Sequence, residues 1–279
     1  WARYFRSKSE FGYIFTMRLH LTPILITILL CLSGCGSREG GASAAQSSGT
    51  ISAPSATIPV VTEAYPPYSL EREGRIEGIS TEVVQAIFRE AGLQPEIRLM
   101  PWVRAYESAR TTPGMLIYSI SRTRERESSF VWIGTIAPYD VSLFSHSSRV
   151  DIKAGPISGM THLRVGLVQG TSVIPWFERE GFSQDKSLDL SNSYEANVRK
   201  LLAGRIDILP TNRLLMQYIL STLGLPPGSV REVMPLPEVS SEGLWLAAHP
   251  KTDPKLVTRL RTALARIRAS GEYLKIINQ

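Results

Sequence analysis

Short apolar runs alternate with helix-period segments along most of this chain, and this order limits the folds that it can adopt. The runs lie at 58–62, 115–120, 165–168 and 206–209, and a polar or glycine-containing turn follows each of them. Amphipathic segments follow the turns, as they do in α/β proteins, where a crossover helix joins one parallel strand to the next. The sequence therefore predicts an α/β fold with largely parallel strands.

Capping residues indicate where several of the helices begin. Ser80 can cap a helix that Gly92 ends, and Ser193 can cap another. Asp253, followed by a proline, can open a long terminal helix that runs to residue 278. The expected helices thus lie between the apolar runs.

Two further apolar strands, 141–145 and 244–248, bracket a block with β and α content of its own. We therefore expect two lobes, each with a mixed, mostly parallel sheet, joined by two crossing hinge strands. The first lobe is predicted to comprise 58–145 and 244–279, and the second to comprise 146–243. A cleft between the lobes follows from this organisation.

The amino-terminal residues have the pattern of an export signal. Trp1 cannot initiate translation, whereas Met17 is followed by basic residues and a short apolar run. We expect residues 1–16 to lie upstream of the true start and residues 17–34 to form a signal peptide. The apolar run is too short for a comfortable membrane span.

The end of this signal, "LSGC", resembles the bacterial lipobox, in which the cysteine is lipidated and becomes the first mature residue. Cys35 occupies that position, and the Gly/Ser/Ala-rich stretch 35–57 is typical of a flexible tether. We therefore expect acyl chains on Cys35 to hold the protein on a bacterial membrane. Its folded part would lie in the periplasm or at the cell surface.

The charge balance and the cysteine count exclude several classes of function. Loss of residues 1–34 removes four basic residues and one acidic residue, which lowers the formal charge from +6 to +3 and weakens a nucleic-acid interpretation. Cys35 is then the single cysteine, so neither a disulfide nor a cysteine metal site can form. His146, His162 and His249 lack metal-ligand spacing. We expect no metal and no cofactor.

Candidate binding residues come directly after the apolar runs, because ligands of open α/β sheets bind beyond the carboxyl ends of the strands. Hydroxyl, amide and arginine side chains dominate these positions. They are Glu63, Tyr65, Tyr68, Ser119, Ser121, Thr123, Arg126, Gln169, Gly170, Thr171, Ser172, Thr211 and Asn212.

Three arginines follow the run 115–120, at positions 122, 124 and 126. One interpretation is that all three form a solvated face. In the other, Arg126 folds back over the strand end and presents its planar guanidinium to a carboxylate, while Arg122 and Arg124 are solvated. Trp102 and Trp132 leave two alternatives open, since each can line a cleft or belong to the core.

The turn Gly170, Thr171 and Ser172 is predicted to lie at a helix N-terminus, where free N–H groups attract an anion; an ordinary helix cap is the alternative. With Arg126 it would supply one anion-holding feature per lobe. The surrounding "GLVQGTS" lacks the lysine of a nucleotide-binding loop.

Several short motifs occur in this order along the chain: "LSGC", "PPYS", "SRTRER" followed by "FVWIG", "VGLVQGTS" and "AGRIDILPTN". With them the chain resembles the bacterial family 3 solute-binding proteins, the periplasmic amino-acid-binding proteins of ABC transporters. The resemblance spans 58–278. It implies the two-lobed type II periplasmic binding fold and a monomer that is not an enzyme.

The resemblance also implies roles for individual residues. Tyr65 would pack against the ligand, Arg126 would grip an α-carboxylate with help from Ser121, and the Thr171 region would add contacts from the second lobe. The family usually has an aspartate where this chain has Asn212, and that aspartate receives the α-ammonium group. Asn212 brings no charge, so Glu63 is the alternative acceptor.

The expected function is capture of a small carboxylate-bearing solute by hinge closure and delivery to an ABC transporter permease. Two alternatives remain open. One is a periplasmic dehydratase-like enzyme on the same fold, with Glu63 as a general acid. The other is a ligand sensor that works without transport.

Overall fold

The computed structural model describes residues 57–240 and 242–278. All of them belong to one compact unit of the chain, Ser55–Gln279. Cys35, the expected signal and nearly all of the expected tether lie outside the described residues. None of the helices in the described residues has the length and apolar character needed to cross a membrane.

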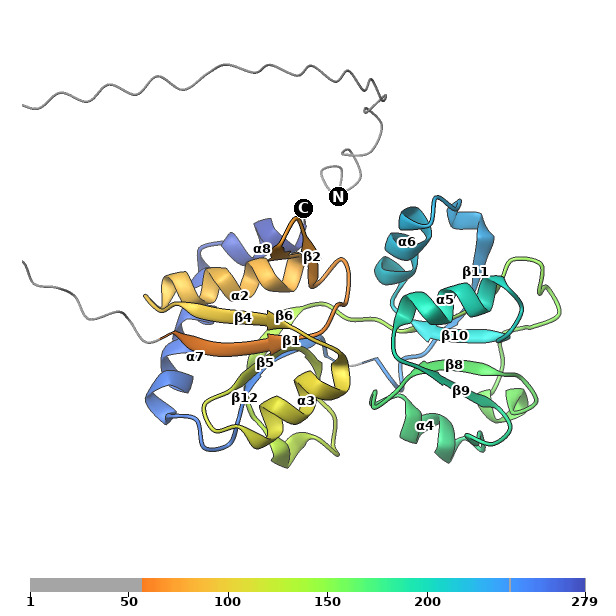
Figure 1. Cartoon of the computed structure of the whole chain (residues 1–279), viewed down its shortest axis with the longest axis horizontal. Helices are drawn as coiled ribbons and strands as arrows, with labels where there is room; N and C mark the ends of the chain where they lie inside the picture. Colours follow the sequence, from red (N-terminus) through yellow and green to blue (C-terminus); the bar gives the residue numbers. More distant parts are fainter. Residues whose placement is uncertain (1–56, 241, 279) are drawn as a thin grey trace, which may run out of the picture. The chain divides into compact units, whose positions relative to one another are not determined.

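The first sheet has five strands in the order β4-β1-β5-β12-β6 (Figure 1). β1 (Ile58–Thr62) pairs in parallel with β4 (Pro95–Leu99) and with β5 (Leu116–Ser121). β12 (Leu244–Ala248) lies antiparallel between β5 and β6 (Val131–Ala137). The strand nearest the end of the chain therefore returns to the sheet that the first strand begins.

The strands of this sheet carry apolar side chains on both faces, and helices cover both faces and bury them. The helices of this part of the chain are α2 (Ile79–Glu90), α3 (Trp102–Thr111), α7 (Pro254–Ala269) and α8 (Glu272–Ile277). Val60 and Leu116 belong to the buried cluster that contains residues of α2 and α7. Their strand neighbours Val61 and Ile117 point the opposite way, into the cluster with Trp102 of α3.

The second sheet also has five strands, in the order β11-β7-β10-β8-β9. β8 pairs in parallel with β9 and β10, whereas β7 lies antiparallel between β10 and β11. Its strands are β7 (Ser142–His146), β8 (Val165–Val168), β9 (Leu188–Ser191), β10 (Ile208–Thr211) and β11 (Val230–Pro235). Its helices are α4 (Ile174–Arg179), α5 (Tyr194–Leu202) and α6 (Arg213–Thr222). The expected α/β class with two mixed sheets is thus present.

The remaining elements are short. They are the hairpin of β2 (Leu70–Arg72) and β3 (Arg75–Glu77) and the 3-10 turns η1 (Glu127–Ser129), η2 (Ile157–Met160) and η3 (Pro227–Ser229).

The chain passes from one sheet to the other twice, between β6 and β7 and between β11 and β12. The two segments are bonded to each other, since Leu236 N donates to Val141 O at 2.8 Å and Val141 N donates to Ser240 Oγ at 2.9 Å. The strand 141–145 is predicted to belong to the first lobe, but among the described residues β7 pairs only within the second sheet. The crossing therefore comes just before β7.

Two expected helix boundaries are wrong. Gly78, with φ of 116°, is the cap of α2, and Ser80 lies inside the helix with a buried hydroxyl. The terminal helix is not continuous, because Gly271 adopts a left-handed φ of 77° and separates α7 from α8. Ser193 and Asp253 cap α5 and α7 as expected, each accepting a backbone N–H.

Candidate functional site

Strand ends from both sheets meet at a small cavity of about 30 Å³. Hydroxyl groups dominate its lining, together with one arginine and one glutamate. The lining residues are Glu63, Tyr65, Trp102, Ser119, Ser121, Arg126, Tyr139, Thr171, Ser172, Val173, Tyr194 and Leu244. A cavity of this size has room for about two water molecules.

Arg126 forms the basic wall of the cavity. Its side chain is 6% exposed, and its guanidinium donates to the carbonyls of Ser121 at 3.3 Å and Gly170 at 3.4 Å. The same group lies over the rings of Trp102 and Tyr106, at 4.9 and 5.1 Å from their centroids. Within residues 57–240 and 242–278 it forms no ion pair, and burial lowers the pKa of Arg126. This positive charge is thus buried without a direct anionic partner.

The other two arginines of the run lie outside the cavity. Arg122 is exposed, pairs with Glu127 at 2.5 Å, and stacks on Trp245 at 4.7 Å. Arg124 is exposed. Of the three, Arg126 alone is buried, which agrees with the interpretation that separated it from its neighbours.

Ser119 reaches the cavity through an irregularity of β5. Opposite it, the register of β12 shifts between Trp245 and Leu246, so Ser119 is the extra residue of a β-bulge. Its φ is 61°, which is uncommon for a residue with a side chain. The buried hydroxyl has no hydrogen-bond partner among the described residues. The local backbone therefore holds an unused donor at the cavity wall.

Glu63 follows β1 and supplies the acidic wall. No hydrogen bond to its carboxyl group is formed by any described residue, and its electrostatic partner is Arg126. Burial opposes the charged form more strongly than Arg126 favours it, and this raises the pKa of Glu63 to about 8. At neutral pH the carboxyl group is therefore mostly protonated.

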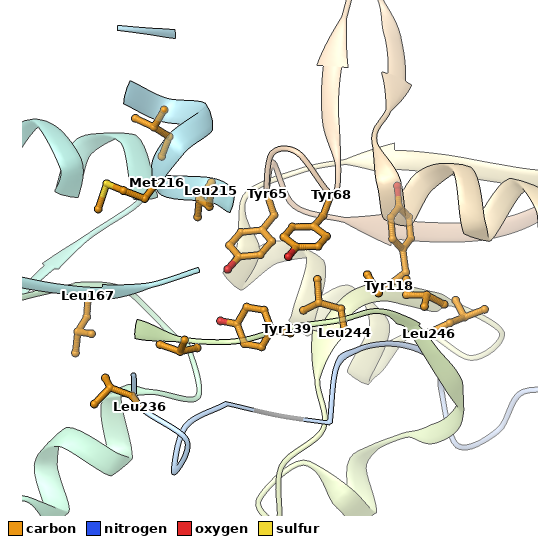
Figure 2. Packing of buried hydrophobic residues seen from close by; sticks show 14 of the residues in the cluster. Tyr65, Tyr68, Tyr118, Tyr139, Leu167, Leu215, Met216, Leu236, Leu244 and Leu246 are labelled. Atoms are coloured by element: carbon orange, nitrogen blue, oxygen red, sulfur yellow. The ribbon is translucent and has the colours of Figure 1, made fainter. Parts of the chain in front are cut away.

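Tyrosine side chains form part of the cavity lining, namely Tyr65, Tyr139 and Tyr194. Tyr65 stacks on Tyr68 at 5.5 Å, and its ring also contacts Tyr194 at 4.9 Å and Tyr139 at 6.2 Å. Figure 2 shows the hydroxyl groups of Tyr65 and Tyr139 directed to the same side. Burial raises the pKa of Tyr65, Tyr139 and Tyr194, so all three remain neutral hydrogen-bonding groups.

The turn at Gly170 differs from the expected helix N-terminus. α4 begins only at Ile174, and the N–H and hydroxyl of Thr171 both donate to Val168 O, at 3.2 and 2.8 Å. The carbonyl of Gly170 instead accepts a hydrogen bond from Trp102 Nε1 at 2.8 Å as well as the one from Arg126. Thr171 lines the cavity, but its N–H is already used.

Asn212 is not among the residues that line the cavity. It is 4% exposed and caps α6, where its Oδ1 accepts from Leu214 N at 2.8 Å. Its Nδ2 donates to the carbonyl of Asp140, also at 2.8 Å. Both ends of the amide are thus occupied, because the residue closes a helix end.

Sequence reasoning missed Tyr139 and Tyr194, and it left Trp102 undecided. Tyr139 comes two residues after β6, and Tyr194 comes three residues after β9. The rule that ligand groups follow strand ends would have found both. β9 was not predicted, because "LDLS" carries only two apolar residues. Trp132 belongs to the core with Trp102 but does not line the cavity.

Comparison with known proteins gives one family and many related structures. Residues 58–279 match the family described as bacterial extracellular solute-binding proteins, family 3. A relative from Neisseria gonorrhoeae named "Probable histidine-binding protein" is 24% identical over 276 residues, which cover 93% of this chain and 94% of the relative.

Two solved structures show the fold. A histidine kinase sensor domain with similarity to periplasmic binding proteins matches with a TM-score of 0.70 and 21% identity, over 79% of this chain and 93% of that chain. An ancestral arginine-binding protein bound to arginine matches with a TM-score of 0.69 and 19% identity, over 79% and 96%. The fold is the two-lobed type II periplasmic binding fold, as the sequence predicted.

Proposed function

Because the chain belongs to the bacterial extracellular solute-binding proteins of family 3, we propose that it captures a free amino acid, or a closely related small solute with a carboxylate, in the cavity around Arg126. Tyr65, Ser119, Ser121 and Thr171 would contribute contacts from the two sheets. Glu63 and the carbonyl side of Gly170 would complete the site.

The observation that carries this proposal is the buried, unpaired charge of Arg126. Burying a cation without an anion is costly, and proteins normally pair such a group. The guanidinium here has only two long hydrogen bonds to carbonyl oxygens. A solute carboxylate would accept two parallel N–H bonds from the same planar group and neutralise it. Ser119 and Ser121 line the same cavity and carry hydroxyl groups.

An amino acid is the favoured solute class. The Neisseria gonorrhoeae relative is named for histidine, and one structural neighbour is bound to arginine. Both compounds carry an α-carboxylate for Arg126, and the tyrosine rings of the cavity offer apolar surface and neutral hydroxyl groups for the remainder of the molecule.

Entry of such a solute requires movement. The cavity of about 30 Å³ is far smaller than the roughly 300–1,000 Å³ of ordinary ligand sites. The two crossing segments, one before β7 and one after β11, would serve as the hinge that opens the strand ends of the two sheets. After closure over the solute, the protein would bind an ABC transporter permease and deliver the solute to it. A lipid on Cys35 would anchor the protein to the membrane.

A thermal-shift screen tests the proposal. The purified protein from Ser55 onward would be heated with L-arginine, L-histidine, L-lysine and L-glutamine, and with the corresponding compounds that lack the carboxylate. A solute at 100 times its Kd adds about 2.7 kcal/mol to the free energy of unfolding. We expect at least one amino acid to raise Tm and its decarboxylated counterpart to have no effect. Equal shifts with both would contradict the carboxylate site.

A sensor function is the second candidate, because the fold matches a histidine kinase sensor domain with a TM-score of 0.70. Solute uptake distinguishes the two functions. Loss of the protein should abolish uptake of the identified solute if it serves a transporter, and should leave uptake unchanged if it serves as a sensor. A dehydratase-like enzyme would instead convert the solute, which mass spectrometry of the incubated mixture would detect.

A further inference from the structure

The positive charge of the folded part is concentrated at its carboxyl end. Residues 251–278 contain seven basic and two acidic residues, a net charge of +5, whereas residues 57–250 contain 19 basic and 21 acidic residues, a net charge of −2. The last two helices, α7 and α8, belong to the first of these stretches. Their surface is thus strongly basic on a protein that is otherwise slightly acidic, and such a surface attracts anionic partners.

Most of this charge lies on the exposed side of α7, away from the buried apolar stripe of the helix. All of the cations of the helix are exposed, and they are Lys255, Arg259, Arg261, Arg266 and Arg268. At 3.6 residues per turn, Lys255, Arg259 and Arg266 fall in one row, and Arg261 and Arg268 fall in a second. We call this surface the basic face of α7.

The exposed positions between the two rows carry small side chains. They are Thr258, Thr262, Ala265 and Ala269. No long side chain between the rows would therefore hold a flat surface away from the charged groups. The basic face can approach a plane of anionic groups closely.

Contacts within the protein hold these cations in place but cancel little of their charge. Arg259, Arg261 and Arg268 donate to backbone carbonyl oxygens, at 3.4, 2.6 and 2.6 Å, and a carbonyl oxygen carries no full negative charge. Arg266 pairs with Glu90 at 3.3 Å. Among residues 57–240 and 242–278, the other four cations of α7 have no acidic partner.

The basic face begins beside the point at which the chain enters the folded part (Figure 1). Ile58 N, at the start of β1, donates to Gln94 O at 2.9 Å, and Gly92 O, two residues earlier, accepts the bond from Arg259. The other end of β1 leads to Glu63 and the cavity. This part of the basic face and the solute cavity thus lie at opposite ends of β1.

We propose that the basic face of α7 docks on the anionic phospholipid headgroups of the membrane. This inference rests on the lipid anchor of the proposed function. Docking would leave the cavity, at the other end of β1, open to solute while the protein waits at the membrane.

The anchor is the reason to expect headgroups rather than another anion. Cys35 is 23 positions before Ile58, so the tether would keep the folded part within roughly 80 Å of the membrane surface. Docking is then an intramolecular step, and a modest attraction suffices because the effective concentration of headgroups is high. Each cation within a Debye length of the surface adds to that attraction.

Co-sedimentation with vesicles measures the docking directly. The protein from Ser55 onward, which lacks the anchor, would be mixed with vesicles of phosphatidylethanolamine and phosphatidylglycerol, and with vesicles of phosphatidylethanolamine and phosphatidylcholine. We expect binding to the first, anionic vesicles alone. Binding should fall by about tenfold or more from about 0.1 M to about 1 M salt, because the Debye length falls from about 10 Å to about 3 Å.

A triple variant, Lys255→Gln/Arg259→Gln/Arg266→Gln, tests whether the basic face is the docking site. It removes one row of cations and keeps residues that favour a helix. We expect its affinity for the anionic vesicles to fall by about tenfold or more.

The matched control is Lys186→Gln/Arg199→Gln/Arg213→Gln. It removes one lysine and two arginines from exposed positions in the part of the chain that forms the second sheet, so the change in net charge is the same. Its affinity for the anionic vesicles should equal that of the unmodified protein.

A dye on the helix gives a second measurement, which holds even if the triple variant does not fold. The protein from Ser55 onward contains no cysteine, so Ala265→Cys in α7 and Ser221→Cys in α6 can each be labelled at a single exposed position. An environment-sensitive dye at position 265 should change its emission on anionic vesicles, and the same dye at position 221 should not.

The outcomes separate this inference from the proposed function. Loss of vesicle binding in the α7 variant, with an unchanged Tm shift on addition of solute, is the expected result. Equal losses in the α7 variant and the control would mean that net charge alone attracts the protein, and would overturn the docking site. Retention on a polyglutamate resin without binding to vesicles would overturn it too, in favour of an acidic protein partner. Failure of every amino acid in the thermal-shift screen would overturn the proposed function and leave the vesicle result unchanged.

Discussion

At the residue scale, the cavity is defined by two ionisable side chains whose burial opposes their charge. Burial lowers the pKa of Arg126 and raises that of Glu63. Burial of these two side chains therefore lowers the stability of the folded state, as burial of charged groups does in many binding sites. A solute that supplies both missing charges would relieve that cost and gain affinity from it.

The raised pKa of Glu63 makes a prediction for stability. An unfolded chain releases this proton near pH 4.3, whereas the folded protein holds it to about pH 8. Between these pH values the folded state binds more protons than the unfolded chain does. The contribution of Glu63 to the free energy of unfolding therefore falls as pH rises, by up to about 1.4 kcal/mol per pH unit. It is fully present below about pH 4 and lost above about pH 8.

Urea unfolding of Glu63→Gln without solute checks this. The glutamine of this variant does not titrate, whereas the unmodified protein loses the contribution of the protonated Glu63 as pH rises. The stability of the variant relative to the unmodified protein should therefore increase from about pH 5 to about pH 8 and then stay level. Glu71→Gln, at an exposed position of β2, is the control, and its stability should follow that of the unmodified protein at every pH. Parallel curves for Glu63→Gln would mean that the carboxyl group is solvated in the free protein.

Most of the cavity residues could be predicted from the sequence, because they obey one rule of topology. Glu63 directly follows β1, Ser121 ends β5 and Arg126 lies in the segment after β5. Parallel strands bring such positions to one edge of the sheet. The engagement of Asn212 could not be predicted, because it depends on Asp140 being delivered by a segment 72 positions away in sequence. The unpaired hydroxyl of Ser119 could not be predicted either, because the bulge that produces it forms only where β5 pairs with the distant strand β12.

At the element scale, the backbone conformations of two glycines set helix boundaries that hydrophobic periodicity alone could not predict. The apolar stripe of α7 is compatible with continuation into α8, but Gly271 turns the chain with a left-handed φ. The start of α4 was misplaced for a related reason: Gly170, with φ of 76°, begins a turn in which Thr171 bonds back to Val168 before any helix forms. Local hydrogen bonding of short polar side chains competes with helix initiation.

Gly271→Ala tests the importance of the break between α7 and α8. No atom lies within 4 Å of the position of an added Cβ, so the cost is that of the backbone alone, about 1–2 kcal/mol. Gly155→Ala is the control, since its surroundings are equally open and its φ lies outside the left-handed region. We expect the first variant to lose stability in urea unfolding and the second to change little. Equal effects would mean that the terminal helices straighten without strain.

At the scale of the whole described molecule, the strand ends of the two sheets meet at the cavity. Trp102 and Arg126, which follow strands of the first sheet, both donate to the carbonyl of Gly170, which follows a strand of the second. In the proposed function, a solute carboxylate would compete with this backbone carbonyl for Arg126. Exchange of the carbonyl for the carboxylate would then couple solute capture to the contact between the sheets.

The most direct test of the account is calorimetric titration of three arginine variants with the amino acid found by screening. Arg126→Ala should cost about 2–5 kcal/mol in binding, because it removes a charge-assisted pair of hydrogen bonds from a buried site. Arg126→Lys should restore only part of this, since an ammonium lacks the planar fork. Arg124→Ala, at an exposed position two residues away, should bind as the unmodified protein does. Equal small losses for Arg126→Ala and Arg124→Ala would contradict the claim that Arg126 holds the solute.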